Sequence, residues 1–112
     1  MRIAFTAQGT NLQAKIDPRF GRTPYILILD SETDNLDVID NRDMADEGHG
    51  AGPKTSQRML EGNASILITG NGPGGNAATV LSSKNIQVFV GAGDMTVAEA
   101  YESYKNNTLK SF

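Results

Sequence analysis

The chain has 112 residues, a length that suits one domain, and its 38% hydrophobic and 21% charged content is ordinary for a globular protein. Its formal net charge of −3 disfavours a nucleic-acid or anionic-membrane surface, and the lack of cysteine excludes disulfides, thiolate metal ligands and a cysteine nucleophile. No apolar run approaches the roughly 20 residues that cross a bilayer, and no signal-peptide core is present, so we expect a single cytoplasmic domain over residues 1–112.

Three strands are predicted in the first half of the chain. RIAFT at 2–6 is the first, and an irregular stretch with two prolines follows over 7–24. The apolar run at 25–29 and the alternating run at 36–40 flank a link of turn formers, so they predict a hairpin whose second strand is half exposed. Eight of the 13 acidic residues lie between positions 30 and 47. This concentration is typical of a solvated edge that resists aggregation, with a cation-binding role as the alternative.

Helices and strands alternate in the second half. Pro53 suits the first position of a helix that ends near Gly62, and Thr96 with Glu99 forms the capping box of the last helix. The predicted elements are a helix over 53–62, a strand over 65–69, a helix over 73–83, a strand over 86–90 and a helix after 96.

This order of elements predicts a ribonuclease-H-like α/β fold. Right-handed crossovers make the last two strands parallel, and the hairpin reverses the second strand. We expect a five-stranded mixed sheet in the order 3-2-1-4-5, with strand 2 antiparallel and three flanking helices. Ligands bind open α/β sheets at the carboxyl ends of the strands. The loops expected to share that edge are 7–24, 41–52, 70–75 and 91–95.

The stretch GNGPGG at 70–75 satisfies the spacing G-x-G-x-x-G. It follows the fourth predicted strand rather than the first strand of a dinucleotide-binding unit, so no nucleotide is expected. Two interpretations remain: a tight strand-to-helix turn, or an anion site formed by backbone N–H groups and the helix dipole. The positions expected to contact such an anion are Asn71, Gly72, Gly74 and Gly75.

The single histidine, His49, lies in the glycine-rich stretch EGHGAG. A lone loop histidine is commonly a solvated side chain. The alternative is a metal ligand, because neutral imidazole binds iron, zinc and copper, and glycine neighbours let the backbone approach a ligand. One histidine cannot complete a metal cage, but it could hold a preassembled cluster with open positions. His49 is therefore a candidate metal ligand, and Gly50 and Gly52 are candidate ligand-binding positions.

Arg19 and Arg22 lie close together in DPRFGRTPY. They are either surface arginines on a proline-fixed loop or forked donors for a carboxylate or another oxyanion. The predicted central strands carry no acid for a two-metal nuclease, and no Ser–His–Asp arrangement is legible. We therefore expect no enzyme activity.

Several stretches together resemble one known family: AKIDPRFGRTPYILILD, GHGAG, SILITGNGPGGNAATVL, IQVFVGAG and TVAEAYESYKNNTL. They are similar to the dinitrogenase iron–molybdenum cofactor biosynthesis family, which includes NifX-like proteins and the carboxyl-terminal domain of NifB-like proteins. The resemblance covers nearly the whole chain, and PRFGR and GNGPGG are its most specific parts.

The resemblance implies a ribonuclease-H-like domain that is not a nuclease. It also implies that an iron–sulfur or iron–molybdenum type cluster, or its precursor, is bound transiently and carried between assembly proteins, with His49 as a ligand. Two alternatives stay open: a module for a small anion without metal, and an adaptor that docks on a partner such as a cluster-assembly ATPase. No nucleic-acid or membrane partner is expected.

Overall fold

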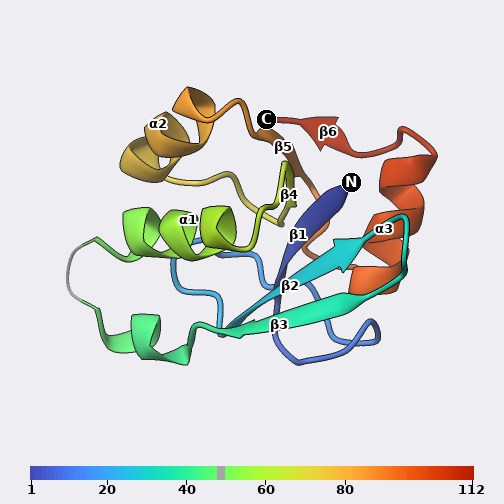
Figure 1. The fold of residues 1–112 in the computed structure, drawn as a ribbon, viewed down its shortest axis with the longest axis horizontal. Coiled ribbons are helices and arrows are strands. Elements are labelled where there is room, and N and C mark those ends of the chain that lie inside the picture. The colour runs from blue at the N-terminus through green and yellow to red at the C-terminus, as the bar shows by residue number, and fades with distance from the viewer. Residues whose placement is uncertain (48–49) are drawn as a thin grey trace.

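The computed structural model describes residues 1–47 and 50–112 (Figure 1). No helix within these ranges is long and apolar enough to span a membrane. The elements in chain order are β1 (Arg2–Ala7), β2 (Tyr25–Asp30), β3 (Leu36–Asp40), the 3-10 helix η1 (Arg42–Asp46), α1 (Ala51–Glu61), β4 (Ile66–Ile68), α2 (Gly75–Ser83), β5 (Gln87–Val90), α3 (Val97–Lys105) and β6 (Lys110–Ser111).

The described strands form one sheet of six, in the order β3-β2-β1-β4-β5-β6. As predicted, β2 runs antiparallel to both of its neighbours, and β1, β4 and β5 are parallel. The predicted total of five strands was wrong, because Lys110 and Ser111 pair antiparallel with the outer edge of β5. A strand of two residues is too short to show an alternating pattern, so the sequence did not reveal it.

The sheet separates two apolar cores. In β1, Phe5 belongs to the core beneath α3, whereas its neighbour Ala4 belongs to the core beneath α1 and α2. Ile68 and Leu67 divide in the same way in β4. Successive residues of a strand point to opposite faces, and helices cover both faces (Figure 1), which explains why these strands are continuous apolar runs.

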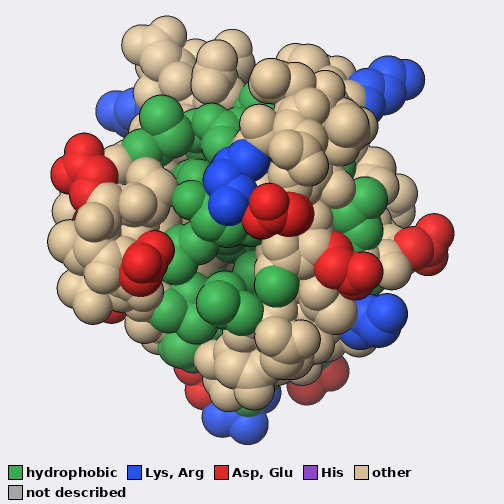
Figure 2. All heavy atoms as spheres, turned by 90° about the vertical axis from the view of Figure 1, so that its right-hand side faces the viewer, with side chains coloured by type: hydrophobic (Ala, Val, Ile, Leu, Met, Phe, Trp, Pro, Cys, Tyr) green, Lys and Arg blue, Asp and Glu red, His purple; other side chains and the backbone are tan. Residues whose placement is uncertain are grey.

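Within the described residues, α3 is the one helix on its face of the sheet, while α1 and α2 share the other. Figure 2 shows the molecule from the right-hand side of Figure 1, where α3 lies, and apolar side chains remain visible there in a shallow hollow between charged groups. The core on the α3 side includes the partly buried Leu36, Tyr101 and Tyr104. A single nine-residue helix is too short to cover six strands completely.

Two helices begin at positions that differ from the prediction. α1 begins at Ala51, so Pro53 is its third residue rather than its first. A proline is tolerated there because the first-turn N–H groups have no acceptor within the helix. α2 begins at Gly75, two residues after Pro73, and Gly74 precedes it in an extended conformation. Both helices nevertheless start at the expected edge of the sheet.

The long loop between β1 and β2 is tied to its surroundings by backbone pairing. Ala7 bridges to Ile16, and Lys15 bridges to Thr96 at the start of α3. Thr96 is also part of the predicted capping box: its Oγ1 accepts the Glu99 N–H at 3.1 Å, and Glu99 Oε1 accepts the Thr96 N–H at 2.9 Å. The loop is therefore held against the rim where the parallel strands end.

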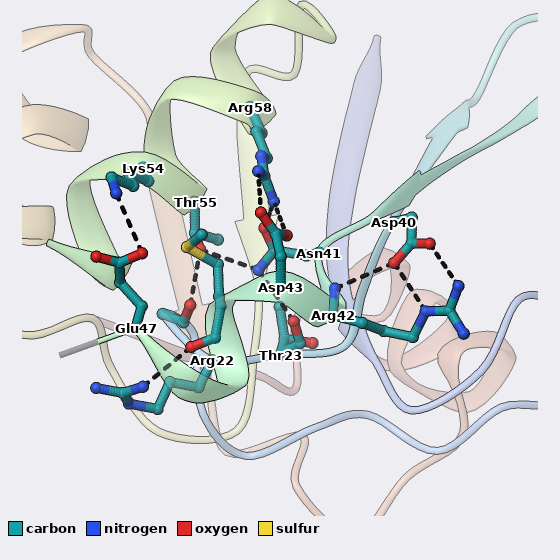
Figure 3. Close-up of polar contacts among 12 residues, drawn as sticks. Arg22, Thr23, Asp40, Asn41, Arg42, Asp43, Glu47, Lys54, Thr55 and Arg58 are labelled. Carbon is teal, nitrogen blue, oxygen red and sulfur yellow. Dashed lines mark hydrogen bonds and ion pairs between the residues drawn. The ribbon is translucent and has the colours of Figure 1, made fainter. Parts of the chain in front are cut away.

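Arginine and lysine side chains form ion pairs with many of the acidic residues at 30–47, and Figure 3 shows several of these pairs. β3, which lies in this stretch, is half exposed as predicted. Among the described residues, no group of three or more His, Cys, Asp or Glu side chains could hold a metal ion. The ion pairs join Asp30 and Asp37 to Arg2, Asp40 to Arg42, Asp43 to Arg58, and Glu47 to Lys54.

These pairs should make stability sensitive to acid. Hydrogen bonds from the side chain and backbone of Arg42 lower the pKa of Asp40 from 3.8 to about 2. A carboxylate with a depressed native pKa contributes stability above its unfolded pKa and loses that contribution as pH falls through the native value. We therefore expect the urea midpoint to fall between about pH 4 and pH 2, and Asp40→Asn to reduce that slope. A midpoint that is constant over this interval would contradict the pairing.

Candidate functional site

A pocket of about 430 Å³ lies where the β1–β2 loop meets the starts of α1 and α2. Its lining residues are Arg19, Phe20, Gly21, Arg22, Gly50, Ala51, Gly52, Pro53, Gly74, Gly75, Asn76 and Ala77. Besides the predicted metal ligand His49, eight positions were predicted to contact a ligand. The pocket brings together six of them: Arg19, Arg22, Gly50, Gly52, Gly74 and Gly75. A larger hollow of about 540 Å³ between α2 and the β5–β6 edge has no charged lining residue, which makes it less suited to an anion.

The other predicted positions are placed differently. Asn71 and Gly72 do not line the pocket. The backbone N–H of Asn71 donates to the Pro18 carbonyl oxygen at 2.8 Å, and a Cβ on Gly72 would overlap the ring of Phe112. The predicted metal ligand His49 lies outside the described residues.

The starts of α1 and α2 both contribute to the pocket wall. Their N-cap residues are Gly50 and Gly74, and in the described chain neither helix has a side-chain cap. Gly50 has φ +81°, a left-handed conformation that favours glycine. The first turns lie close together, since a Cβ on Gly52 would be 3.1 Å from the Ala77 Cβ. Uncapped N–H groups and two helix dipoles at one hollow favour a negatively charged ligand.

Arg19 is neutralised by a buried carboxylate. Its Nε and Nη2 donate to the two carboxylate oxygens of Asp17, each at 3.2 Å, and the Asp17 side chain is only 3% exposed. The hydrogen bond to Asp17 raises the pKa of Arg19. Asp17 also accepts the backbone N–H of Arg19 at 2.8 Å. The Asp17 carboxylate therefore compensates much of the positive charge of Arg19 within the loop.

Arg22 has different surroundings. Its Nη1 donates to the carbonyl oxygens of Met44 at 3.0 Å and Ala45 at 3.1 Å, both in η1. No ion pair joins Arg22 to a carboxylate in residues 1–47 and 50–112. Neutral carbonyl groups hold this guanidinium without cancelling its charge, so Arg22 remains available to an anion at the pocket. The sequence alone did not distinguish Arg22 from Arg19.

Known proteins resemble this chain in sequence and in fold. A family model described as "Dinitrogenase iron-molybdenum cofactor" matches residues 1–107. The apo form of the orange protein from Desulfovibrio gigas is 31% identical with a TM-score of 0.93, over 99% of this chain and 92% of that one. A putative NifB protein from Thermotoga is 33% identical with a TM-score of 0.85, over 98% and 91%. No curated protein matches. These matches confirm the family resemblance seen in the sequence.

Proposed function

Because the chain belongs to the dinitrogenase iron-molybdenum cofactor family, we propose that it is a non-catalytic carrier in metallocluster assembly. Its cargo is an iron–sulfur or iron–molybdenum type cluster, or the precursor of one, bound transiently. The observation that supports this proposal is the pocket where two uncapped helix starts meet Arg22.

The cargo would be held both through its negative charge and through one metal ligand. Backbone N–H groups of the first turns of α1 and α2 donate to the sulfide or oxide atoms of the cluster, and Arg22 adds a charge-assisted hydrogen bond. His49, which precedes Gly50 in the sequence, supplies one coordination bond to a metal. Hydrogen bonds and a single exchangeable ligand can hold a cluster and release it again, which supports carriage rather than catalysis.

Anaerobic reconstitution tests this function. We expect the protein incubated with ferrous iron, sulfide and molybdate to retain iron and sulfide after gel filtration and to show a visible absorption band. His49→Ala should lose most of the band because its coordination bond is removed, whereas Lys84→Ala, at an exposed position after α2, should retain it. If His49→Ala and the wild type behave alike, the histidine assignment fails. If the wild type retains no metal, the carrier proposal fails.

The second candidate is a small-anion module without metal, which acts as an adaptor on a cluster-assembly protein or ATPase. The same pocket favours it, since uncapped helix starts and Arg22 bind any compact anion of suitable size. Isothermal titration with sulfate and molybdate separates the two functions. Binding of these oxyanions by a protein that retains no iron would favour the small-anion module over the carrier.

A further inference from the structure

Asn41 is a fully buried polar residue between β3 and η1. Its Nδ2 donates to the Thr23 carbonyl oxygen at 2.9 Å and to Thr55 Oγ1 at 3.0 Å, and its Oδ1 accepts from Arg58 Nη1 at 2.7 Å (Figure 3). A guanidinium only donates and a carbonyl only accepts, so these contacts define the orientation of the amide. One side chain therefore links the β1–β2 loop to α1.

The backbone of Asn41 makes two further connections. Its N–H donates to the Pro24 carbonyl oxygen at 2.8 Å, and its carbonyl oxygen accepts the Met44 N–H at 3.0 Å, which forms the first turn of η1. Residues 19–24, which we call the arginine loop, are thus joined through Asn41 to η1 as well as to α1. Each of these bonds is buried or partly buried, where an unpaired polar group is costly.

These connections converge on Arg22. Its guanidinium donates to the carbonyl oxygens of Met44 and Ala45 in η1, and η1 begins directly after Asn41. The residue after Arg22 is Thr23, whose carbonyl oxygen Asn41 binds. Asn41 therefore fixes both the backbone beside Arg22 and the carbonyl groups that its guanidinium contacts.

Thr55 strengthens the same arrangement from α1. Its Oγ1 donates to the Gly21 carbonyl oxygen at 2.7 Å while it accepts from Asn41, and its side chain is fully buried. Gly21 lies so close to α1 that an added Cβ would be 3.0 Å from the Gly52 nitrogen. The threonine hydroxyl thus holds the arginine loop against the helix start that forms the pocket wall.

We propose that Asn41, supported by Thr55, is a positioning residue that keeps the Arg22 guanidinium at the rim of the pocket for contact with an anion. The identity of the anion rests on the proposed function, but the placement of Arg22 is a property of the free protein. The two can therefore be tested separately.

The first test observes Arg22 directly, without ligand. In nitrogen-15 NMR spectra assigned with Arg22→Lys, the wild-type guanidinium of Arg22 should show hindered rotation, because its Nη1 donates to two carbonyl oxygens. In Asn41→Ala and in the milder Thr55→Val, rotation should become faster, so that the separate Nη resonances of Arg22 merge. Asp43→Asn, which weakens the exposed Arg58 pair and leaves the Asn41 contacts, should not. Unchanged Arg22 resonances in folded Thr55→Val and Asn41→Ala would overturn the proposal, and Thr55→Val serves alone if Asn41→Ala does not fold.

The second test uses inorganic molybdate as the probe. Arg22→Ala and Asn41→Ala should each weaken its binding by at least about tenfold. If Asn41 acts through Arg22, the double variant should bind no more weakly than Arg22→Ala alone. If the losses of binding free energy in the two single variants add fully in the double variant, the proposal is overturned, because Asn41 would then affect molybdate binding independently of Arg22. If the wild type does not bind molybdate, the anion pocket is contradicted, while the NMR comparison still decides the role of Asn41.

Discussion

Replacing Gly70 with alanine is expected to destabilise the protein by about 3 kcal/mol, near the top of the usual range for overpacking. A Cβ at Gly70 would lie 2.6 Å from the Cα of Pro18 and 3.2 Å from the Cα of Gly93. Both atoms belong to the backbone, so neither can move aside by rotating a side chain. The substitution must instead push apart the loops that follow β1 and β5.

The hydrogen bonds at this crossing would be strained by the same movement. The Gly70 carbonyl oxygen accepts the Gly91 N–H at 2.9 Å, and the neighbouring Asn71 N–H donates to the Pro18 carbonyl oxygen at 2.8 Å. Loops that leave three different strands therefore share one point of close contact. Gly70 allows them to lie close together, and Pro18 directly precedes the arginine loop that carries Arg19 and Arg22.

Thermal and urea unfolding measure this prediction. For a domain of this size, a loss of about 3 kcal/mol corresponds to a fall in Tm of at least about 10 °C. Gly74→Ala is the matched control in the same loop, because no atom beyond its chain neighbours lies within 4 Å of its added Cβ and its φ is −66°. We expect that control to remain within about 0.5 kcal/mol of the wild type. Equal losses in both variants would show that flexibility of the glycine loop, and not close contact, determines its stability.

The sequence predicted the framework of the fold because that framework depends on local patterns. The apolar runs of β1, β2 and β4 and the capping box at Thr96 are visible within a few residues, and the crossover rule then gives the strand order. The pairing of β6 with β5 depends on how the chain returns after α3, which no short window encodes. The starts of α1 and α2 were misplaced because prolines near a helix start are compatible with more than one position.

The pocket was predicted in part for a related reason. Loops at the carboxyl ends of parallel strands must share an edge, so Arg19, Arg22 and the starts of α1 and α2 could be placed together. The partner of each arginine could not be predicted, because Asp17 is close to both in sequence and only the folded loop shows which one it binds. Asn41 had no recognisable motif either, since an asparagine after a strand usually indicates a turn.

The difference between the two arginines leads to a large expected difference in binding. Arg22→Ala should weaken binding of the anionic cluster by about 10- to 100-fold, the range that corresponds to one charge-assisted hydrogen bond. Arg19→Ala should weaken it only a few-fold, because Asp17 already compensates that charge. Arg22→Lys should recover part of the affinity, since it keeps the charge but replaces the planar guanidinium whose Nη1 donates to two carbonyl oxygens of η1.

Stability should respond in the opposite order. Arg19→Ala leaves the carboxylate of Asp17, which is 3% exposed, without its guanidinium partner, and we expect a loss of about 1–2 kcal/mol. Arg22→Ala frees two carbonyl groups at a partly exposed site, where water can replace the guanidinium, so its loss should be smaller. Equilibrium dialysis of the reconstituted cluster and urea unfolding of the same variants measure the two effects. If Arg19→Ala reduced affinity as much as Arg22→Ala, both charges would face the ligand, and the Asp17 pair would have to open when the cluster binds.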